Sequence, residues 1–192
     1  MMAMASWCTT YIVSTTERLP ARVRRAAFLA CVLLAGTARA EPRILPLDPA
    51  HAAIAFRAYA FALVPIDGSF SRFSGVLQID PAAPGTCRVD VTVDVTSLQM
   101  PTPAIRDATL SANMLDADTF PTLAYSGSCT DQGIDGVLTL HGTARPLRFS
   151  ILNGQASYAA EASLRRRDWG ITGRPLKVGP TVRIRVSTEL PP

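Results

Sequence analysis

The strongest constraint on the fold is a strict alternation of apolar and polar residues in the middle of the chain. From residue 88 to residue 95 every second residue is valine, and the residues between are charged or carry a hydroxyl group. The same period of two recurs over residues 54–60, 147–151 and 182–187. Successive side chains of a strand point to opposite faces of a sheet, so this period predicts strands with one buried and one solvated face.

Turn-forming residues separate these strands, and the combination indicates one all-β domain. Clusters that contain Gly, Asp or Asn fall at residues 66–68, 131–133, 135–136 and 153–154. Short strands at fairly even spacing, with such clusters between them, are typical of a β-sandwich or a β-barrel. We expect an antiparallel barrel of about eight strands over residues 41–192.

One segment breaks the alternation. Residues 105–115 contain few turn residues and show no period of two, and Pro121 follows them. This pattern predicts a short helical excursion, with the return to strand at the proline.

The first 40 residues have the pattern of a secretory signal peptide. Three arginines between residues 22 and 25 precede an apolar run at residues 26–35, and an Ala-Arg-Ala cleavage site ends at Ala40. The apolar run is too short for a membrane-spanning helix, which needs about 20 residues. We expect cleavage after Ala40, a mature chain of residues 41–192 and a periplasmic location.

Export removes the basic character of the chain. Five of the 19 Lys and Arg residues and one of the 15 Asp and Glu residues lie in residues 1–40, so residues 41–192 hold 14 of each and have no net charge. A nucleic-acid-binding domain would need a basic face. We therefore expect no nucleic-acid partner.

Two cysteines remain in the exported part, Cys87 and Cys129. An even pair in an oxidising compartment favours a disulfide over two free buried thiols. Cys87 begins the valine-rich strand, and Cys129 ends the strand predicted over residues 122–129. If these strands are antiparallel neighbours, the two Cα atoms lie at the separation that a disulfide requires, about 4.4–6.8 Å.

The sequence contains none of the patterns that would indicate an enzyme or a metal site. The only histidines are His51 and His141, and the mature part has neither an H-x-H nor a C-x-x-C spacing. A catalytic zinc needs three protein ligands, and a structural zinc needs four. There is also no G-x-S-x-G motif and no glycine-rich phosphate loop. We expect no catalytic residue, no metal and no cofactor.

Three arginines at residues 165–167 precede Asp168 and Trp169. The apolar residues of the preceding strand occupy even positions, so the alternation points Arg166 inward and its two neighbours outward. A buried charge needs a partner or an open end of the barrel. Arg166 could close one barrel end, paired with Asp168 or stacked on Trp169, or it could contact the head group of a ligand.

The order of several motifs resembles that of the YceI-like family of exported bacterial proteins. The family pattern D-x-x-H-S-x-V-x-F is similar to residues 48–56, and G-x-F-x-x-F-x-G-x-L-x-x-D is similar to residues 68–80. Residues 107–121 resemble the family's D-x-x-L segment, residues 136–146 its G-x-L-T-L-x-G-x-T-x-P element, and residues 166–170 its closing R-x-D-F-G. No single motif is specific, but the ordered set covers most of the mature chain.

The resemblance implies an extended antiparallel barrel of the lipocalin type, with a long apolar interior that holds polyisoprenoids, isoprenoid quinones or other amphiphilic lipids. It also implies a periplasmic location and no established catalysis. Three positions depart from the family pattern. Ala52 stands where serine is frequent, and Ala60 and Thr109 stand where histidine is frequent. Each departure removes a polar group from the expected ligand path.

Two functions stay open at this point. The protein could be a periplasmic carrier that sequesters one long-chain amphiphile by burial of apolar surface. Alternatively, its own side chains fill the barrel, and it acts without a ligand as a partner of a membrane redox or envelope-stress system. The sequence does not decide between a monomer and a homodimer. The predicted cavity wall consists of inward-facing residues, with Arg166 at one end: Ile54, Phe56, Ala58, Val89, Val91, Val93, Tyr125, Leu138, Leu140, Phe149, Tyr158, Arg166, Val182 and Ile184.

Overall fold

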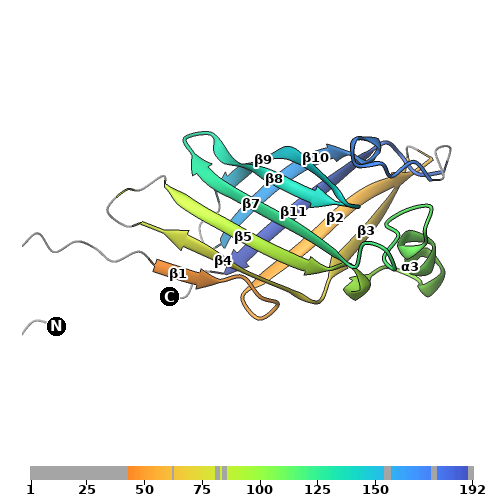
Figure 1. Cartoon of the computed structure of the whole chain (residues 1–192), viewed down its shortest axis with the longest axis horizontal. Coiled ribbons are helices and arrows are strands. Elements are labelled where there is room, and N and C mark those ends of the chain that lie inside the picture. The colour runs from red at the N-terminus through yellow and green to blue at the C-terminus, as the bar shows by residue number, and fades with distance from the viewer. Residues whose placement is uncertain are drawn as a thin grey trace, which may run out of the picture. The chain divides into compact units, whose positions relative to one another are not determined.

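Antiparallel strands make up most of the residues that the structure describes (Figure 1). The computed structural model describes residues 43–61, 63–80, 83, 86–153, 157–173 and 177–189. The predicted signal peptide lies outside the described residues. Within them the sheet has eleven strand segments, in the order β1-β4-β5-β7-β8-β9-β10-β11-β2-β3-β6. The segments are β1 (Arg43–Pro46), β2 (Ala52–Ala60), β3 (Val64–Phe70), β4 (Phe73–Ile79), β5 (Cys87–Asp94), β6 (Leu98–Gln99), β7 (Thr122–Thr130), β8 (Gly133–Leu140), β9 (Thr143–Asn153), β10 (Ser157–Arg165) and β11 (Thr181–Glu189).

Three long strands are each interrupted by a kink, so that each consists of two segments. These strands are β1 with β2, β3 with β4, and β5 with β6. β1 pairs with β4 while β2 pairs with β3, and β4 pairs with β5 while β3 pairs with β6. Backbone hydrogen bonds continue this pairing across the kinks, from Leu47 N to Gly75 O (2.9 Å) and from Asp94 N to Arg72 O (3.0 Å). Joining the three pairs turns the eleven segments into eight strands, each with a partner on both sides. The expected all-β antiparallel barrel of about eight strands is confirmed.

Side chains fix the kink that ends the valine alternation. A short 3-10 helix, η2 (Val95–Ser97), follows β5 and leads into β6. The Asp94 carboxylate accepts hydrogen bonds from Thr96 N (2.8 Å) and from Arg72 Nε (2.9 Å). Val95 is therefore the last residue of the alternation, because the capped turn redirects the chain directly after β5.

Two clusters that the sequence predicts as turns lie inside strands instead. Residues 66–68 belong to β3, and residues 135–136 belong to β8. A Cβ atom added at Gly68 would overlap the Phe56 ring, and one added at Gly136 would lie 2.6 Å from the Tyr125 ring. These glycines leave room for an aromatic ring on the neighbouring strand. Glycine can therefore be needed inside a strand as well as in a turn.

The helical excursion is α3 (Pro103–Leu110), which begins two residues before the predicted start and ends five residues before the predicted end. The Thr102 hydroxyl accepts from Ile105 N, and Pro103 occupies the first turn, so a cap and a preorganised proline set the start. Turns follow the helix. The Arg106 guanidinium anchors the helix to the barrel by donating to Leu98 O (2.9 Å) and Thr96 O (2.8 Å).

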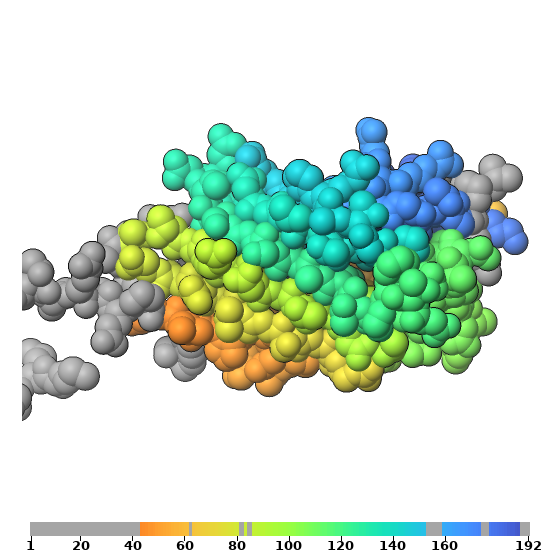
Figure 2. All heavy atoms as spheres, in the orientation of Figure 1, coloured from red at the N-terminus to blue at the C-terminus, as the bar shows by residue number. Residues whose placement is uncertain are grey.

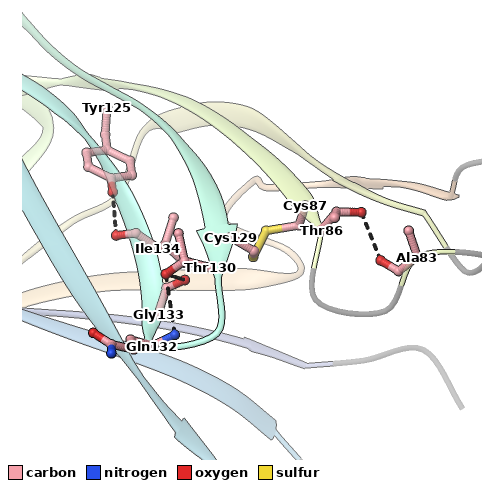
Figure 3. The surroundings of a disulfide bond; sticks show 9 residues. All are labelled: Ala83, Thr86, Cys87, Tyr125, Cys129, Thr130, Gln132, Gly133 and Ile134. Atoms are coloured by element: carbon pink, nitrogen blue, oxygen red, sulfur yellow. Dashed lines mark hydrogen bonds between the residues drawn. A yellow bond between two sulfur atoms is a disulfide. The ribbon is translucent and has the colours of Figure 1, made fainter.

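The predicted disulfide between Cys87 and Cys129 is confirmed (Figure 3). β5 and β7 are antiparallel neighbours in which Arg88 faces Ser128, so the two cysteines face each other one position further along. Their Cα atoms are 4.8 Å apart, within the range of unstrained disulfides. The bridge lies at the end of β5 far from α3 (Figure 1).

Aromatic side chains fill the interior close to the disulfide. The rings of Tyr125 and Phe149 pack edge to face with centroids 5.0 Å apart, and both residues are buried together with Val89. The Tyr125 hydroxyl lies within hydrogen-bonding distance of the backbone carbonyls of Ile134 (3.1 Å) and Leu147 (3.2 Å), which share its single proton. The buried Tyr125 hydroxyl thus has hydrogen-bond partners, so the side chain can fill this part of the barrel without an unsatisfied polar group.

Tyr125 makes the stability of the barrel sensitive to alkaline pH. Burial, and to a lesser extent the Asp135 carboxylate, raises the pKa of the Tyr125 hydroxyl from 10.0 to about 12. The unfolded chain loses this proton near pH 10, while the folded chain retains it. The stabilisation is therefore complete below pH 10 and is lost as the pH rises through 12.

We expect Tyr125→Phe to lower the free energy of unfolding by about 1–2 kcal/mol at neutral pH, because two carbonyls lose a donor. The advantage of the wild type over this variant should then fall by about 1.4 kcal/mol per pH unit between the two pKa values. Urea unfolding of both proteins at several alkaline pH values measures this difference. A difference that stays constant with pH would contradict the assigned burial of the hydroxyl.

Candidate ligand-binding cavity

The barrel encloses an apolar cavity of about 370 Å³ on the side covered by α3. Its wall comes mainly from β2, β3, β8, β11 and α3, with Leu164 and Arg166 at the end of β10. Among the described residues of this wall, only Thr109, Arg166 and Lys177 have side chains with oxygen or nitrogen atoms. The wall is therefore built for apolar contact, with polar groups at few positions.

The cavity reaches the surface between α3 and the tip of the β2–β3 hairpin. Three of its wall residues, Phe61, Ala104 and Lys177, are exposed to solvent. Figure 2 shows the green atoms of α3 and the turns after it at one end of the barrel, next to blue atoms of the C-terminal part of the chain. This end is the mouth of the cavity.

Eight of the predicted wall residues line this cavity. They come from the three strands β2, β8 and β11 and from the residue that follows β10, and the alternation placed all of them inward: Ile54, Phe56, Ala58, Leu138, Leu140, Arg166, Val182 and Ile184. The inward face of these strands was thus predictable, because parity along a strand decides which side chains share a face.

Five other predicted residues lie elsewhere in the interior and do not line this cavity. Val89, Tyr125 and Phe149 belong to the larger core cluster. Val93 belongs to a smaller cluster with Ile54 and Phe73, and Val91 packs against both clusters. These residues pack against one another in the interior beside the cavity. The side chain of Tyr158, the remaining predicted residue, lies outside the described part of the chain.

The sequence analysis missed the contribution of α3. Ala104, Ile105, Ala108 and Thr109 line the cavity from one face of the helix. Positions four apart in a helix share a face, so the small apolar residues at 104 and 108 were the available signal. The departures from the family pattern at Ala60 and Thr109 also lie in the wall.

Arg166 is buried and holds the loop next to the mouth. The short 3-10 helix η3 (Arg166–Trp169) follows β10, and Arg166 is only 2% exposed. Its guanidinium donates to four backbone carbonyls, those of Gly179 (3.0 Å), Ile171 (3.1 Å), Gly173 (2.7 Å) and Val178 (3.1 Å).

These contacts support the structural interpretation of Arg166 over a head-group contact. The expected partner Asp168 is exposed, and the Trp169 ring nitrogen donates to Leu138 O (3.1 Å) instead. The inward direction of Arg166 was correct, but its partners are carbonyls of a loop whose path the strand alternation cannot show. Burial, followed by the nearby Arg167 charge, lowers the pKa of the Arg166 guanidinium, which still stays protonated at neutral pH.

The family model for the YceI-like domain matches residues 46–190. The chain belongs to the YceI-like family. Among its relatives, the protein YceI of Escherichia coli O17:K52:H18 is 28% identical over 160 residues, which cover 75% of this chain and 83% of the relative. A UPF0312 protein of Shewanella baltica (strain OS185) is 29% identical over 159 residues, which cover 74% and 83%.

Two solved structures share the fold. BcnA of Burkholderia cenocepacia superposes with a TM-score of 0.65 at 21% identity, covering 76% of this chain and 99% of that one. A polyisoprenoid binding domain from Saccharophagus degradans superposes with a TM-score of 0.55 at 13% identity, covering 79% and 100%. At these identities the likeness establishes the barrel fold alone.

Among the residues that the structure describes, no three His, Cys, Asp or Glu side chains lie close enough together to hold a metal ion. In the same part of the chain, no helix is long and apolar enough to cross a membrane.

Proposed function

We propose that this protein binds one apolar or amphiphilic lipid in the cavity beside α3, without catalysis, and carries or sequesters it in the periplasm. The observation that carries the proposal is the cavity of about 370 Å³, whose wall is apolar apart from three side chains. Two of those three are already engaged within the protein, since Thr109 donates to Ile105 O (2.7 Å) and Arg166 holds the loop carbonyls. Lys177 at the mouth is placed to meet the polar end of a ligand.

The size of the cavity limits how the lipid is held. Ligand pockets in proteins span about 300–1,000 Å³, so this cavity is at the small end of the range. We propose that one end of the lipid lies inside the cavity and that the rest of the lipid extends through the mouth, because Tyr125 and Phe149 occupy the interior near the disulfide. A polyisoprenoid or the tail of an isoprenoid quinone fits this description, and the Saccharophagus domain of the same fold is described as polyisoprenoid binding.

We also propose a membrane redox partner and a periplasmic location. A membrane redox partner is compatible with a bound quinone, since a carrier must receive and deliver its ligand. The periplasmic location depends on the predicted signal peptide.

Ala58→Phe tests the cavity most directly. Ala58 lies on β2 with its side chain in the wall and is 8% exposed, so a phenyl group there occupies the ligand's space. We expect an isoprenoid quinone with a short tail to bind the variant at least tenfold more weakly, a loss of about 1.4 kcal/mol or more. Titration of the protein with the quinone, followed by calorimetry, measures the dissociation constant.

Ala53→Phe is the matched control for this substitution. Ala53 lies on the same strand with its side chain on the exposed face, so the same change in volume leaves the cavity intact. Both variants should unfold within a few degrees of the wild type. If the folded Ala58→Phe protein binds the quinone as tightly as the Ala53→Phe protein, the ligand does not occupy this cavity.

A further inference from the structure

The tip of the β2–β3 hairpin exposes large apolar side chains beside the cavity mouth. Phe61 is 64% exposed, Leu63 82% and Val64 56%, and the Tyr59 ring is 37% exposed next to them. Hairpin turns are usually made of Gly, Asn, Asp, Ser or Pro. A cluster of exposed apolar side chains marks contact with another apolar surface.

The tip is braced although one of its residues is strained. Phe61 has a φ of 49°, a left-handed conformation that is rare for a bulky side chain. Its amide donates to Lys177 O (3.1 Å), and the Tyr59 carbonyl accepts from Gly179 N (2.7 Å). The guanidinium of Arg166 holds the same segment through the carbonyls of Val178 and Gly179. A strained residue with rigid support is typical of a functional surface.

The charge beside the tip is positive. Lys177 is the only lysine of the chain, and it is exposed at the mouth. The nearest charged residues along the hairpin, Arg57 and Asp67, neutralise each other in an ion pair of 2.6 Å. The described part of the hairpin end thus presents an apolar tip with one cation at its base.

We propose that this tip, formed by Tyr59, Phe61, Leu63 and Val64, inserts into the surface of a lipid bilayer, with Lys177 at the level of the lipid phosphates. Four side chains at a turn cover much less than the roughly 800 Å² that each partner contributes to a stable protein interface. A bilayer requires no complementary shape, and a lysine near an anionic surface adds attraction.

Docking in this orientation brings the cavity to the membrane. Phe61 and Lys177 belong both to the tip region and to the cavity wall, so the mouth meets the bilayer where the tip enters it. An apolar ligand then passes between lipid and barrel without crossing water. This inference goes beyond the proposed ligand binding, because the tip can dock whether the cavity is filled or empty.

Cosedimentation with vesicles tests the proposal without any added ligand. The full chain is mixed with vesicles of phosphatidylethanolamine and phosphatidylglycerol, and the bound fraction is measured. We expect binding by the wild type and at least tenfold weaker partition for Leu63→Ser/Val64→Thr, since burial of each apolar side chain is lost. Neither residue lines the cavity, so quinone binding in solution should be unchanged. Every variant carries the same N-terminal apolar run, which contributes equally to all of them.

Two controls separate the tip from general stickiness and from ligand binding. Ile44→Ser removes an equally exposed apolar side chain from β1 (63% exposed) and should bind vesicles like the wild type. Ala58→Phe should also dock like the wild type, so a failure of docking and a failure of ligand binding are distinguishable. Lys177→Gln should weaken binding about fivefold on the anionic vesicles and leave binding to phosphatidylcholine vesicles unchanged.

The proposal is overturned if the wild type does not sediment with vesicles, or if Leu63→Ser/Val64→Thr partitions as strongly as Ile44→Ser. The proposal is also overturned if the tip does not bind vesicles but is needed for a complex with another protein. The tip would then contact a protein surface and not a bilayer.

Discussion

Replacing Arg166 with methionine is expected to lower the free energy of unfolding by about 3–5 kcal/mol. The methionine fills a similar volume but leaves four backbone carbonyls without their donor, those of Ile171, Gly173, Val178 and Gly179. Buried carbonyls that lose a charged donor keep the full cost of desolvation. The loss is smaller than the sum of four bonds because water can reach the partly exposed carbonyls.

Arg165→Met and Arg167→Met are the matched controls. These neighbours have exposed side chains, so each change should alter stability by about 0.5 kcal/mol or less. Arg166→Lys should restore only part of the loss, because an ammonium group lacks the planar fork that reaches several carbonyls at once. Urea unfolding at neutral pH compares the four variants with the wild type. Equal midpoints for Arg166→Met and Arg165→Met would show that the loop does not depend on the guanidinium.

Arg166 also connects the fold to the surface of the cavity mouth. Two of the carbonyls that it holds, those of Val178 and Gly179, belong to the segment that braces the hairpin tip through Tyr59 and Phe61. A loosened segment in Arg166→Met should therefore weaken vesicle docking as well as stability. The Arg166 guanidinium thus affects the cavity mouth by holding the backbone beside it.

Loss of the disulfide should have an effect of similar size. Cys87 and Cys129 close a loop with a sequence separation of 42 residues, and the chain-entropy model gives about 4 kcal/mol for a loop of this length. We expect Cys87→Ser/Cys129→Ser to unfold at correspondingly lower urea concentration. Reduction of the wild type should reproduce the loss, while the double variant should not respond to reductant.

The variant without the disulfide also separates an effect on stability from an effect on ligand binding. The disulfide lies close to the filled part of the interior, near Val89 and Phe149, and none of these residues lines the cavity. The folded double variant should therefore bind a quinone as tightly as the wild type. A stability difference below about 1 kcal/mol between oxidised and reduced wild type would contradict the entropic role of the bridge.

The inward or outward direction of the strand side chains was the part of the structure that the sequence predicted well. Alternation is local, so it identified β5, β9 and β11 and the inward direction of Arg166 without knowledge of the partner strands. The clusters of turn-forming residues misled at Gly68 and Gly136, which look like turn residues but lie in β3 and β8. Their role is to make room for the rings of Phe56 and Tyr125, and these contacts exist only once the strands are paired.

The position of the cavity was not predictable from parity. Alternation separates inward from outward side chains, but it does not show whether inward side chains meet across the barrel. Tyr125 and Phe149 do meet, and they close one part of the interior. Ala58 and Ala108 leave space on the side of α3, a region for which the sequence predicted a helix without its orientation.

Native mass spectrometry of the protein purified from a bacterial periplasm, with organic extraction of the same sample, tests the binding function most directly. We expect a discrete added mass that is recovered in the extract as a lipid or an isoprenoid quinone and that is missing from Ala58→Phe. A mass that matches the processed chain alone, with no uptake of added polyprenols or quinones, would contradict the proposal that the cavity holds a lipid.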